Sequence, residues 1–252
     1  MTDRNQLSDN AWAQIQTLLS TTKGARLLKA PSCRRFVEAV LWILRTGAQW
    51  RMLPSRFGAW NSVFKRFSRW CRLGICNKLH SALSLEADLQ HVCIDSSIIR
   101  AHACAAGAAH SSASEEALGR SRGGFGRKIH ALTDALGLPI RFILTGAQTA
   151  DITQTVSLLE GISTSALLAD KGYDANTLLA WLEGRQIQAV IPPRSHRLEQ
   201  RSCDWHLYKE RHVIECMFGK LKHYRRIATR YEKKASHFQS MLAFAAALLW
   251  LR

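Results

Sequence analysis

The residues best suited to chemistry are carboxylates that follow short apolar segments. Asp95 follows the apolar residues 92–94, and Asp170 ends the segment 166–170. Neighbouring strands of one sheet would place both acids at the same edge, where carboxylates could converge on two divalent ions about 4 Å apart and cleave a phosphodiester. An Asp at the end of an apolar strand is also often a turn residue or a helix cap. Three further acids show the same pattern, and the last two resemble N-caps: Asp134, Asp151 and Asp174.

A better-marked acid lies in a C-terminal segment that is predicted to form a long helix from about His206. Four side chains follow spacings of +3, +4 and +7: Tyr208, Arg211, Glu215 and Lys222. At roughly 100° per residue they fall within about 60° of arc. The helix therefore presents an acid beside an aromatic hydroxyl, a guanidinium and an ammonium group. A purely structural ladder of ion pairs would have the same spacing, and the sequence leaves this alternative open.

The composition indicates a polyanionic partner. Lys and Arg total 35 against 19 Asp and Glu, which gives a formal net charge of +16. Nucleic acid and an anionic membrane surface would satisfy this charge equally. The longest apolar stretch, residues 241–251, is shorter than the roughly 20 residues of a membrane-spanning helix, and the first six residues lack the apolar core of a signal peptide. We therefore expect nucleic acid, and no membrane, as the partner.

Cysteine usage indicates a reducing compartment. The chain has seven cysteines, and no two of them are separated by two residues. We interpret them as reduced thiols in a cytoplasmic protein. His102, Cys104 and His110 could in principle hold zinc, but zinc sites usually have paired close spacings on both halves of the ligand set. We expect no zinc site.

The part of the chain up to about residue 85 has helical periodicity. One predicted helix includes apolar residues between 37 and 44 and stops at Gly47, and another carries an apolar stripe from Trp60 to Trp70. Basic residues lie largely off that stripe: Lys65, Arg66, Arg69 and Arg72. Two helices joined by a Gly/Pro-containing turn, the second with a basic outer face, match a helix-turn-helix that reads duplex DNA. An amphipathic bundle with a solvated basic face is the alternative.

From residue 91 the periodicity changes to that of strands. A hairpin is predicted around Gly137, and helices and strands then alternate from residue 151 to the C-terminal helix. Strands followed by an α-β-α-β-α order are typical of a ribonuclease-H-like fold. We therefore predict an α/β protein: a ribonuclease-H-like mixed sheet flanked by helices in residues 89–252, and an all-helical, helix-turn-helix-like DNA-binding domain in residues 1–88.

A Gly- and Arg-rich passage, residues 119–128, is predicted to interrupt the regular structure. It holds no nucleotide-binding P-loop motif. We interpret it as a mobile basic loop near DNA phosphate, and a plain solvated linker is the alternative. Its candidate DNA contacts are Arg120, Arg122, Arg127 and Lys128.

The spacing Tyr208-x2-Arg211-x3-Glu215-x6-Lys222 resembles the Y-R-E-K motif of the DDE transposases encoded by bacterial insertion sequences. Further segments are similar to this family in the same order along almost the whole chain: 39–54, 94–102, 118–125, 128–139, 167–175 and 207–231. The resemblance implies a ribonuclease-H-like catalytic domain in which Asp95, Asp170 and Glu215 are the three acids that bind metal. It also implies dependence on Mg²⁺, for which Mn²⁺ would substitute. The chain departs from the family's usual residues at Met52 and near Cys216 and Gly219.

The same resemblance implies a function. The enzyme would bind the terminal inverted repeats of an insertion sequence, cleave the element's ends, and join the 3′-hydroxyls to target DNA. Arg211 and Lys222 would contact the phosphate backbone and Tyr208 would position the reacting phosphate. Joining two ends implies a homodimer in a paired-end complex. The alternatives are a DNA-binding relic or repressor without catalysis and, less favoured, a structure-selective nuclease.

Overall fold

The computed structural model describes residues 6–25, 30–106, 111–112, 115–121, 124–198 and 200–251. The chain forms two compact units, and each is described by itself. The first contains Met1–Leu85, Arg100–Glu116 and Leu221–Arg252, and the second contains Glu86–Ile99 and Ala117–Lys220. The division into domains at 1–88 and 89–252 thus differs from these units in where the C-terminal segment packs. It remains a prediction.

The first unit is helical. Its elements are α1 (Asp9–Thr21), α2 (Ala30–Thr46), η1 (Trp50–Met52), η2 (Ser55–Phe57), α3 (Trp60–Leu73), α4 (Ile75–Leu83), η4 (Ala103–Ala105), α9 (Arg225–Ala228), β7 (Thr229–Arg230) and α10 (Ala235–Trp250); η3 (Ser84–Glu86) ends it on the way to the second unit. Ser8 caps α1 by accepting the Ala11 N–H at 3.2 Å. Gly74, in the left-handed conformation, ends α3.

The C-terminal helix α10 closes the core of the first unit. Nearly all of its residues from Phe238 to Leu249 are buried, and it packs against α3 and α4. The segment before it is fixed by Arg226, which is buried and pairs with Glu232 at 2.5 Å. The longest apolar stretch of the sequence thus forms part of a buried helix. No helix in the described ranges is long and apolar enough to cross a membrane.

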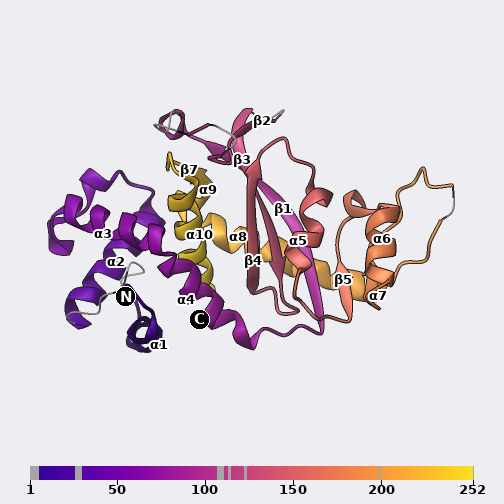
Figure 1. Ribbon diagram of the computed structural model, residues 1–252, viewed down its shortest axis with the longest axis horizontal. Coiled ribbons are helices and arrows are strands. Elements are labelled where there is room, and N and C mark those ends of the chain that lie inside the picture. The colour runs from indigo at the N-terminus through magenta and orange to yellow at the C-terminus, as the bar shows by residue number, and fades with distance from the viewer. Residues whose placement is uncertain are drawn as a thin grey trace. The chain divides into compact units, whose positions relative to one another are not determined.

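The second unit is built on a mixed sheet (Figure 1). Its elements are β1 (His91–Ala101), β2 (Gly119–Ser121), β3 (Gly124–Thr133), β4 (Pro139–Gly146), η5 (Asp151–Gln154), α5 (Thr155–Leu159), β5 (Ala166–Leu168), η6 (Lys171–Tyr173), α6 (Asn176–Glu183), β6 (Gln188–Val190), α7 (Trp205–Tyr208), η7 (Lys209–Arg211) and α8 (His212–Lys222). The strand order is β2-β3-β1-β5-β6, with β4 on β3. The predicted α/β class, a mixed sheet flanked by helices together with an N-terminal helical region, is confirmed.

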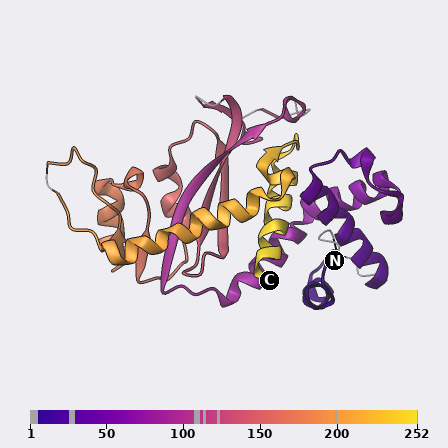
Figure 2. The same cartoon turned by 180° about the vertical axis from the view of Figure 1, so that it is seen from behind.

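The sheet combines antiparallel and parallel pairs. The hairpin β3–β4 is antiparallel, whereas β5 pairs in parallel with both β1 and β6. The predicted turn at Gly137 is present with φ +77°, and a Cβ there would lie 2.8 Å from the Val213 side chain. Glycine is therefore required for both the turn and the approach of α8. Figure 2 shows α7, η7 and α8 as one long orange helix across a face of the sheet.

The predicted mobile loop at residues 119–128 is wrong for the described residues. β2 and β3 form an antiparallel pair from Gly119 to Gly126, and β3 continues into its pairing with β4. Backbone pairing on both sides of β3 outweighs the weak strand preference of the glycines. Arg127 is consequently fully buried and Lys128 nearly so, whereas Arg120 is exposed in β2. Arg122 lies outside the described residues.

The buried centre of the sheet generates a stability prediction. Leu167 in β5 is fully buried in the apolar core of the second unit. We expect Leu167→Ala to lower the free energy of unfolding by about 2–5 kcal/mol, because it removes buried methyl groups and leaves a cavity. Leu136→Ala is the matched control, since Leu136 is 70% exposed and its truncation should change stability by less than about 0.5 kcal/mol. Urea unfolding checks both values, and equal effects would contradict this packing.

Candidate active site

Strand register brings Asp95 and Asp170 together. β1 and β5 are parallel neighbours in which Cys93 is opposite Leu168, and each acid lies two residues beyond this pair. Because side chains alternate along a strand, both carboxylates emerge on the same face, on strands about 4.8 Å apart. Asp170 keeps an extended backbone, with φ −75° and ψ 170°, and accepts the Gly172 N–H at 2.7 Å. It therefore also caps η6, the alternative role that sequence left open.

Asp95 lies in a largely buried position. Its side chain is 23% exposed, its Oδ1 accepts the Ser96 N–H at 2.7 Å, and its Oδ2 lies 3.2 Å from Nη1 of Arg211. Burial raises the pKa of Asp95 above its ordinary value. The Ser96 N–H and the Arg211 charge oppose this rise, and the nearby Asp170 carboxylate adds to it. The two aspartates thus share one electrostatic environment.

Arg211, the last residue of η7, connects strand β1 to helix α8. One nitrogen of its guanidinium contacts Asp95 and another pairs with Oε1 of Glu215. The guanidinium also lies 5.9 Å from the centre of the Tyr208 ring. Three of the four residues on the predicted helix face therefore contact one another, although η7 tightens the helix between them. Lys222 is the last residue of α8 and is exposed.

The donor chemistry of these acids suits a divalent ion. Carboxylate oxygens are hard ligands of the kind that Mg²⁺ prefers, and Asp95 and Asp170 lie side by side with such oxygens. Glu215 is held on the other side of the Arg211 guanidinium and is 58% exposed. Within the described part of the chain, no three His, Cys, Asp or Glu residues are grouped as a metal site. The two aspartates fit a metal ion as placed, and Glu215 is tied to Arg211.

A fourth acid, Asp151, belongs to the surroundings of Asp95. It accepts the Ser96 hydroxyl at 2.7 Å and pairs with the Lys128 ammonium at 2.8 Å. The interpretation of Asp151 as an N-cap is wrong, because the cap position of η5 is Ala150. Lys128, which was predicted to contact DNA, instead forms this ion pair with Asp151. Nearby His130 is buried, which lowers its pKa to about 4.

Asp174 is likewise not the helix cap that its position suggested. Its carboxylate is fully buried and pairs with Arg197 at 2.6 Å and Arg201 at 2.9 Å. It also accepts the Arg194 N–H at 2.8 Å. These contacts hold the chain segment after β6 against the start of α6. Asp174 is therefore a structural acid, and it leaves Asp170 as the acid beside Asp95.

The basic residues that were predicted to form one DNA-binding face lie on α3, and the structure places them in different surroundings. Lys65 and Arg72 are exposed on α3, and Arg69 is partly buried. Arg66 packs on α2 instead, with its guanidinium 4.3 Å from the Phe36 ring and 3.2 Å from Sγ of Cys33. A cation–π contact of this kind keeps Arg66 on the inner side of the helix pair. Its predicted role in DNA binding therefore requires it to leave this packing.

Family models match most of the chain. The description "Putative transposase of IS4/5 family" matches residues 7–80, and "Transposase DDE domain" matches residues 86–250. A "Putative transposase for insertion sequence element IS6501" from Brucella ovis is 43% identical over 127 residues, which cover 50% of this chain and 98% of the relative. A "Putative transposase for insertion sequence element IS402" from Burkholderia cepacia is 34% identical over 136 residues, which cover 49% of this chain and 62% of the relative.

Two solved structures are weakly similar. A piggyBac transposase synaptic complex with hairpin DNA aligns at 14% identity and a TM-score of 0.40, over 80% of this chain and 45% of that chain. A pre-cleavage Mos1 transpososome aligns at 11% identity and a TM-score of 0.28, over 88% of this chain and 98% of that chain. The family assignment rests on the sequence matches, of which the DDE domain alone covers more than half of the chain. The chain belongs to the DDE transposases of bacterial insertion sequences, in the IS4/5 family.

Proposed function

We propose that this transposase binds the terminal inverted repeats of its insertion sequence, cleaves the element's ends, and joins the freed 3′-hydroxyls to target DNA. The observation that carries the proposal is the placement of Asp95 beside Asp170, with Arg211 linking Asp95 to Glu215. A helix-borne guanidinium between carboxylates combines a metal-ligand set with a phosphate-binding group. The enzyme would work as a homodimer that holds two ends together, in the bacterial cytoplasm.

Both reactions exchange one ester bond of phosphorus for another bond. In end cleavage, water attacks the phosphorus and the bond to the 3′-oxygen breaks, which leaves a 3′-hydroxyl and a 5′-phosphate. In joining, that 3′-hydroxyl attacks a phosphodiester of the target, and the target's own 3′-oxygen leaves. The bonds formed and broken balance, so the joining step requires no external energy source.

The chain's own residues would supply charge and position. Asp95, Asp170 and Glu215 would hold Mg²⁺, with Mn²⁺ as a substitute; when bound, the metal activates the attacking oxygen and neutralises charge on the leaving oxygen. Members of this family typically depend on divalent metal ions. Arg211, released from its contacts with the acids, would bind the reacting phosphate, and Tyr208 would orient it. Lys222 would contact the backbone further along the same helix.

A catalytically inactive DNA-binding relic or repressor is the competing function. Such a protein would need the basic helices but not the acids. All three acids are present at the positions that the family motifs predict, and two of them lie together in the structure. This observation favours the enzyme.

Replacement of the acids tests catalysis. We expect Asp95→Asn, Asp170→Asn and Glu215→Gln each to lower end cleavage on inverted-repeat DNA by at least about 100-fold, since loss of even a supporting hydrogen-bond partner of a metal ligand costs roughly 10–100-fold. Glu210→Gln is the matched control, because Glu210 is exposed on the same helical stretch and carries the same charge. Gel analysis of cleaved ends gives the rates. Equal cleavage rates for all four variants would contradict the assignment of these three acids to catalysis.

Metal removal separates the enzyme from the relic. We expect chelation with EDTA to abolish end cleavage while DNA binding persists, because the basic surfaces do not require metal. Addition of Mg²⁺ or Mn²⁺ in excess of EDTA should restore cleavage. Parallel cleavage and mobility-shift assays on one DNA fragment measure both properties. Cleavage that continues in EDTA would contradict metal-dependent chemistry, and binding without wild-type cleavage in any metal would support the relic.

A further inference from the structure

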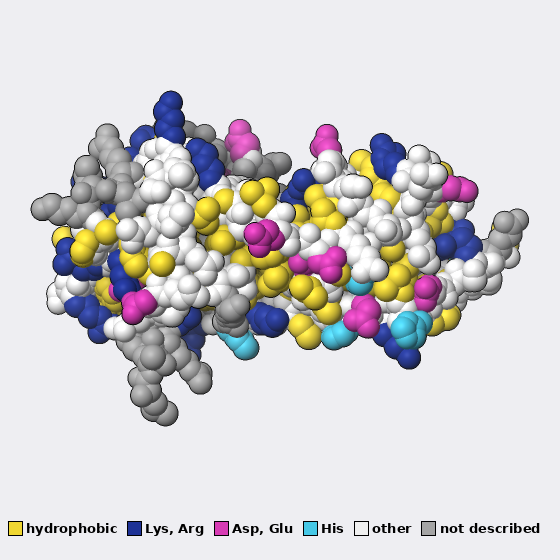
Figure 3. Space-filling view, turned by 90° about the horizontal axis from the view of Figure 1, so that it is seen from below, with side chains coloured by type: hydrophobic (Ala, Val, Ile, Leu, Met, Phe, Trp, Pro, Cys, Tyr) yellow, Lys and Arg dark blue, Asp and Glu magenta, His cyan; other side chains and the backbone are white. Residues whose placement is uncertain are grey.

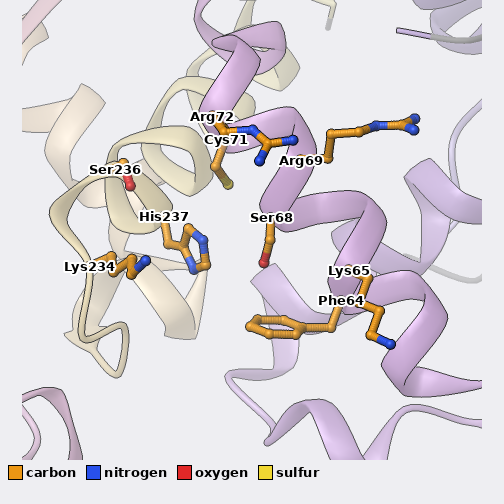
Figure 4. A pocket seen from close by; sticks show the side chains of 9 residues that line it. All are labelled: Phe64, Lys65, Ser68, Arg69, Cys71, Arg72, Lys234, Ser236 and His237. Carbon is orange, nitrogen blue, oxygen red and sulfur yellow. The ribbon is translucent and has the colours of Figure 1, made fainter. Parts of the chain in front are cut away.

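A basic pocket lies in the first unit between α3 and the start of α10 (Figure 4). Its volume is about 740 Å³. Four cationic side chains line it: Lys65, Arg69, Arg72 and Lys234. Two hydroxyl groups, of Ser68 and Ser236, lie among them, and the lining contains no Asp or Glu. The lining therefore combines cationic side chains with hydroxyl groups.

The α3 side of this pocket is a single helix face. Lys65, Ser68, Arg69 and Arg72 follow one another at i, i+3, i+4 and i+7, which places them on one stripe of the helix. Arg66 lies off this stripe and packs on Phe36 of α2. Three basic residues of α3 therefore line the pocket, whereas Arg66 packs between α3 and α2.

The α10 side is held rigidly. The His237 ring contacts the rings of Phe64 and Phe67, with centroids 5.9 and 5.8 Å apart, and so ties α10 to α3. Figure 4 shows the Phe64 and His237 rings directed into the space between the two helices, with Lys234 and Ser236 beside them. Two aromatic rings, one from each helix, thus line the space between α3 and the start of α10.

The backbone before Lys234 is also fixed. Arg230 is fully buried and donates to the carbonyl oxygens of Glu232, Lys233 and Glu116 at 2.7, 2.8 and 2.6 Å. The Glu116 carboxylate accepts the N–H of Ala235 at the start of α10. These contacts hold Lys234 at a defined place before any partner binds. A cation on a preorganised backbone loses less entropy on binding than one on a loose segment.

We propose that this pocket binds the sugar-phosphate backbone of DNA, with Lys234 and Ser236 of the C-terminal segment acting together with the basic face of α3. The inference rests on the proposed function, which makes the chain a DNA-binding protein. Lys, Arg and Ser side chains are the groups that contact phosphate oxygens in protein–DNA complexes. Lys and Arg side chains are scattered over the face seen in Figure 3, so net charge alone does not locate the contact. The four cationic and two hydroxyl side chains that line this one pocket do locate it.

The salt dependence of DNA binding tests the proposal. Binding of the full-length protein to a short duplex of random sequence would be measured by fluorescence anisotropy over a range of salt concentrations. We expect Lys234→Ala to reduce the slope of log K against log salt by about one unit, and Lys65→Ala with Lys234→Ala by about two, because each lost phosphate contact releases one counterion fewer. Lys234→Arg should keep the wild-type slope.

Lys233→Ala is the matched control, because Lys233 precedes Lys234, is exposed, and does not line the pocket. If wild type binds DNA but Lys234→Ala and Lys233→Ala have the same slope, the pocket is not the site, and the transposase function stands. If wild type binds no DNA, both proposals fail. Competition by polyglutamate as effective as by DNA of equal charge would overturn the proposal in favour of an acidic peptide. Thermal melting of each variant confirms that it is folded.

Discussion

The contact of Arg211 with Asp95 and Glu215 is the interaction on which the active-site geometry depends. Asp95 is fixed by a strand in the middle of the sheet, whereas Glu215 stands on a helix that crosses the sheet. The carboxylates of Asp95 and Glu215 would repel each other, but the Arg211 guanidinium between them attracts both. Arg211 thereby holds the two acids close together. In the function proposed above, the same guanidinium would bind the reacting phosphate.

The parallel register of β1 and β5 supplies the second constraint. A shift of one residue in that pairing would turn either Asp95 or Asp170 to the opposite face of the sheet. The register is maintained by fully buried apolar residues, including Val92 and Leu167. Burial of this core therefore does more than stabilise the unit, because it sets which two carboxylates share a face. The fourth acid, Asp151, supports this arrangement through the Ser96 hydroxyl.

Local features of the site could be predicted from the sequence, and long-range ones could not. The turn at Gly137 and the contacts of Arg211 with Tyr208 and Glu215 depend on residues a few positions apart, so periodicity was enough. The partners of Asp151 and Asp174 are some 20 to 55 residues away along the chain, and no local pattern marks them. The choice of Asp170 over Asp174 came from family resemblance, and the buried arginine contacts of Asp174 give it a physical reason. The glycines in residues 119–128 favoured the prediction of a loop, whereas the structure shows paired strands there. Composition does not reveal strand pairing.

The joining reaction tests the central claim, that one acid site performs polynucleotide transfer, most directly. A DNA end already cleaved to a free 3′-hydroxyl would be incubated with supercoiled plasmid, Mg²⁺ and protein, and covalent joints would be measured on a denaturing gel. We expect joints with wild type and with Glu210→Gln, and none above background with Asp170→Asn. Joining at the wild-type rate by Asp170→Asn, or binding of the end by wild type without any joining, would contradict it.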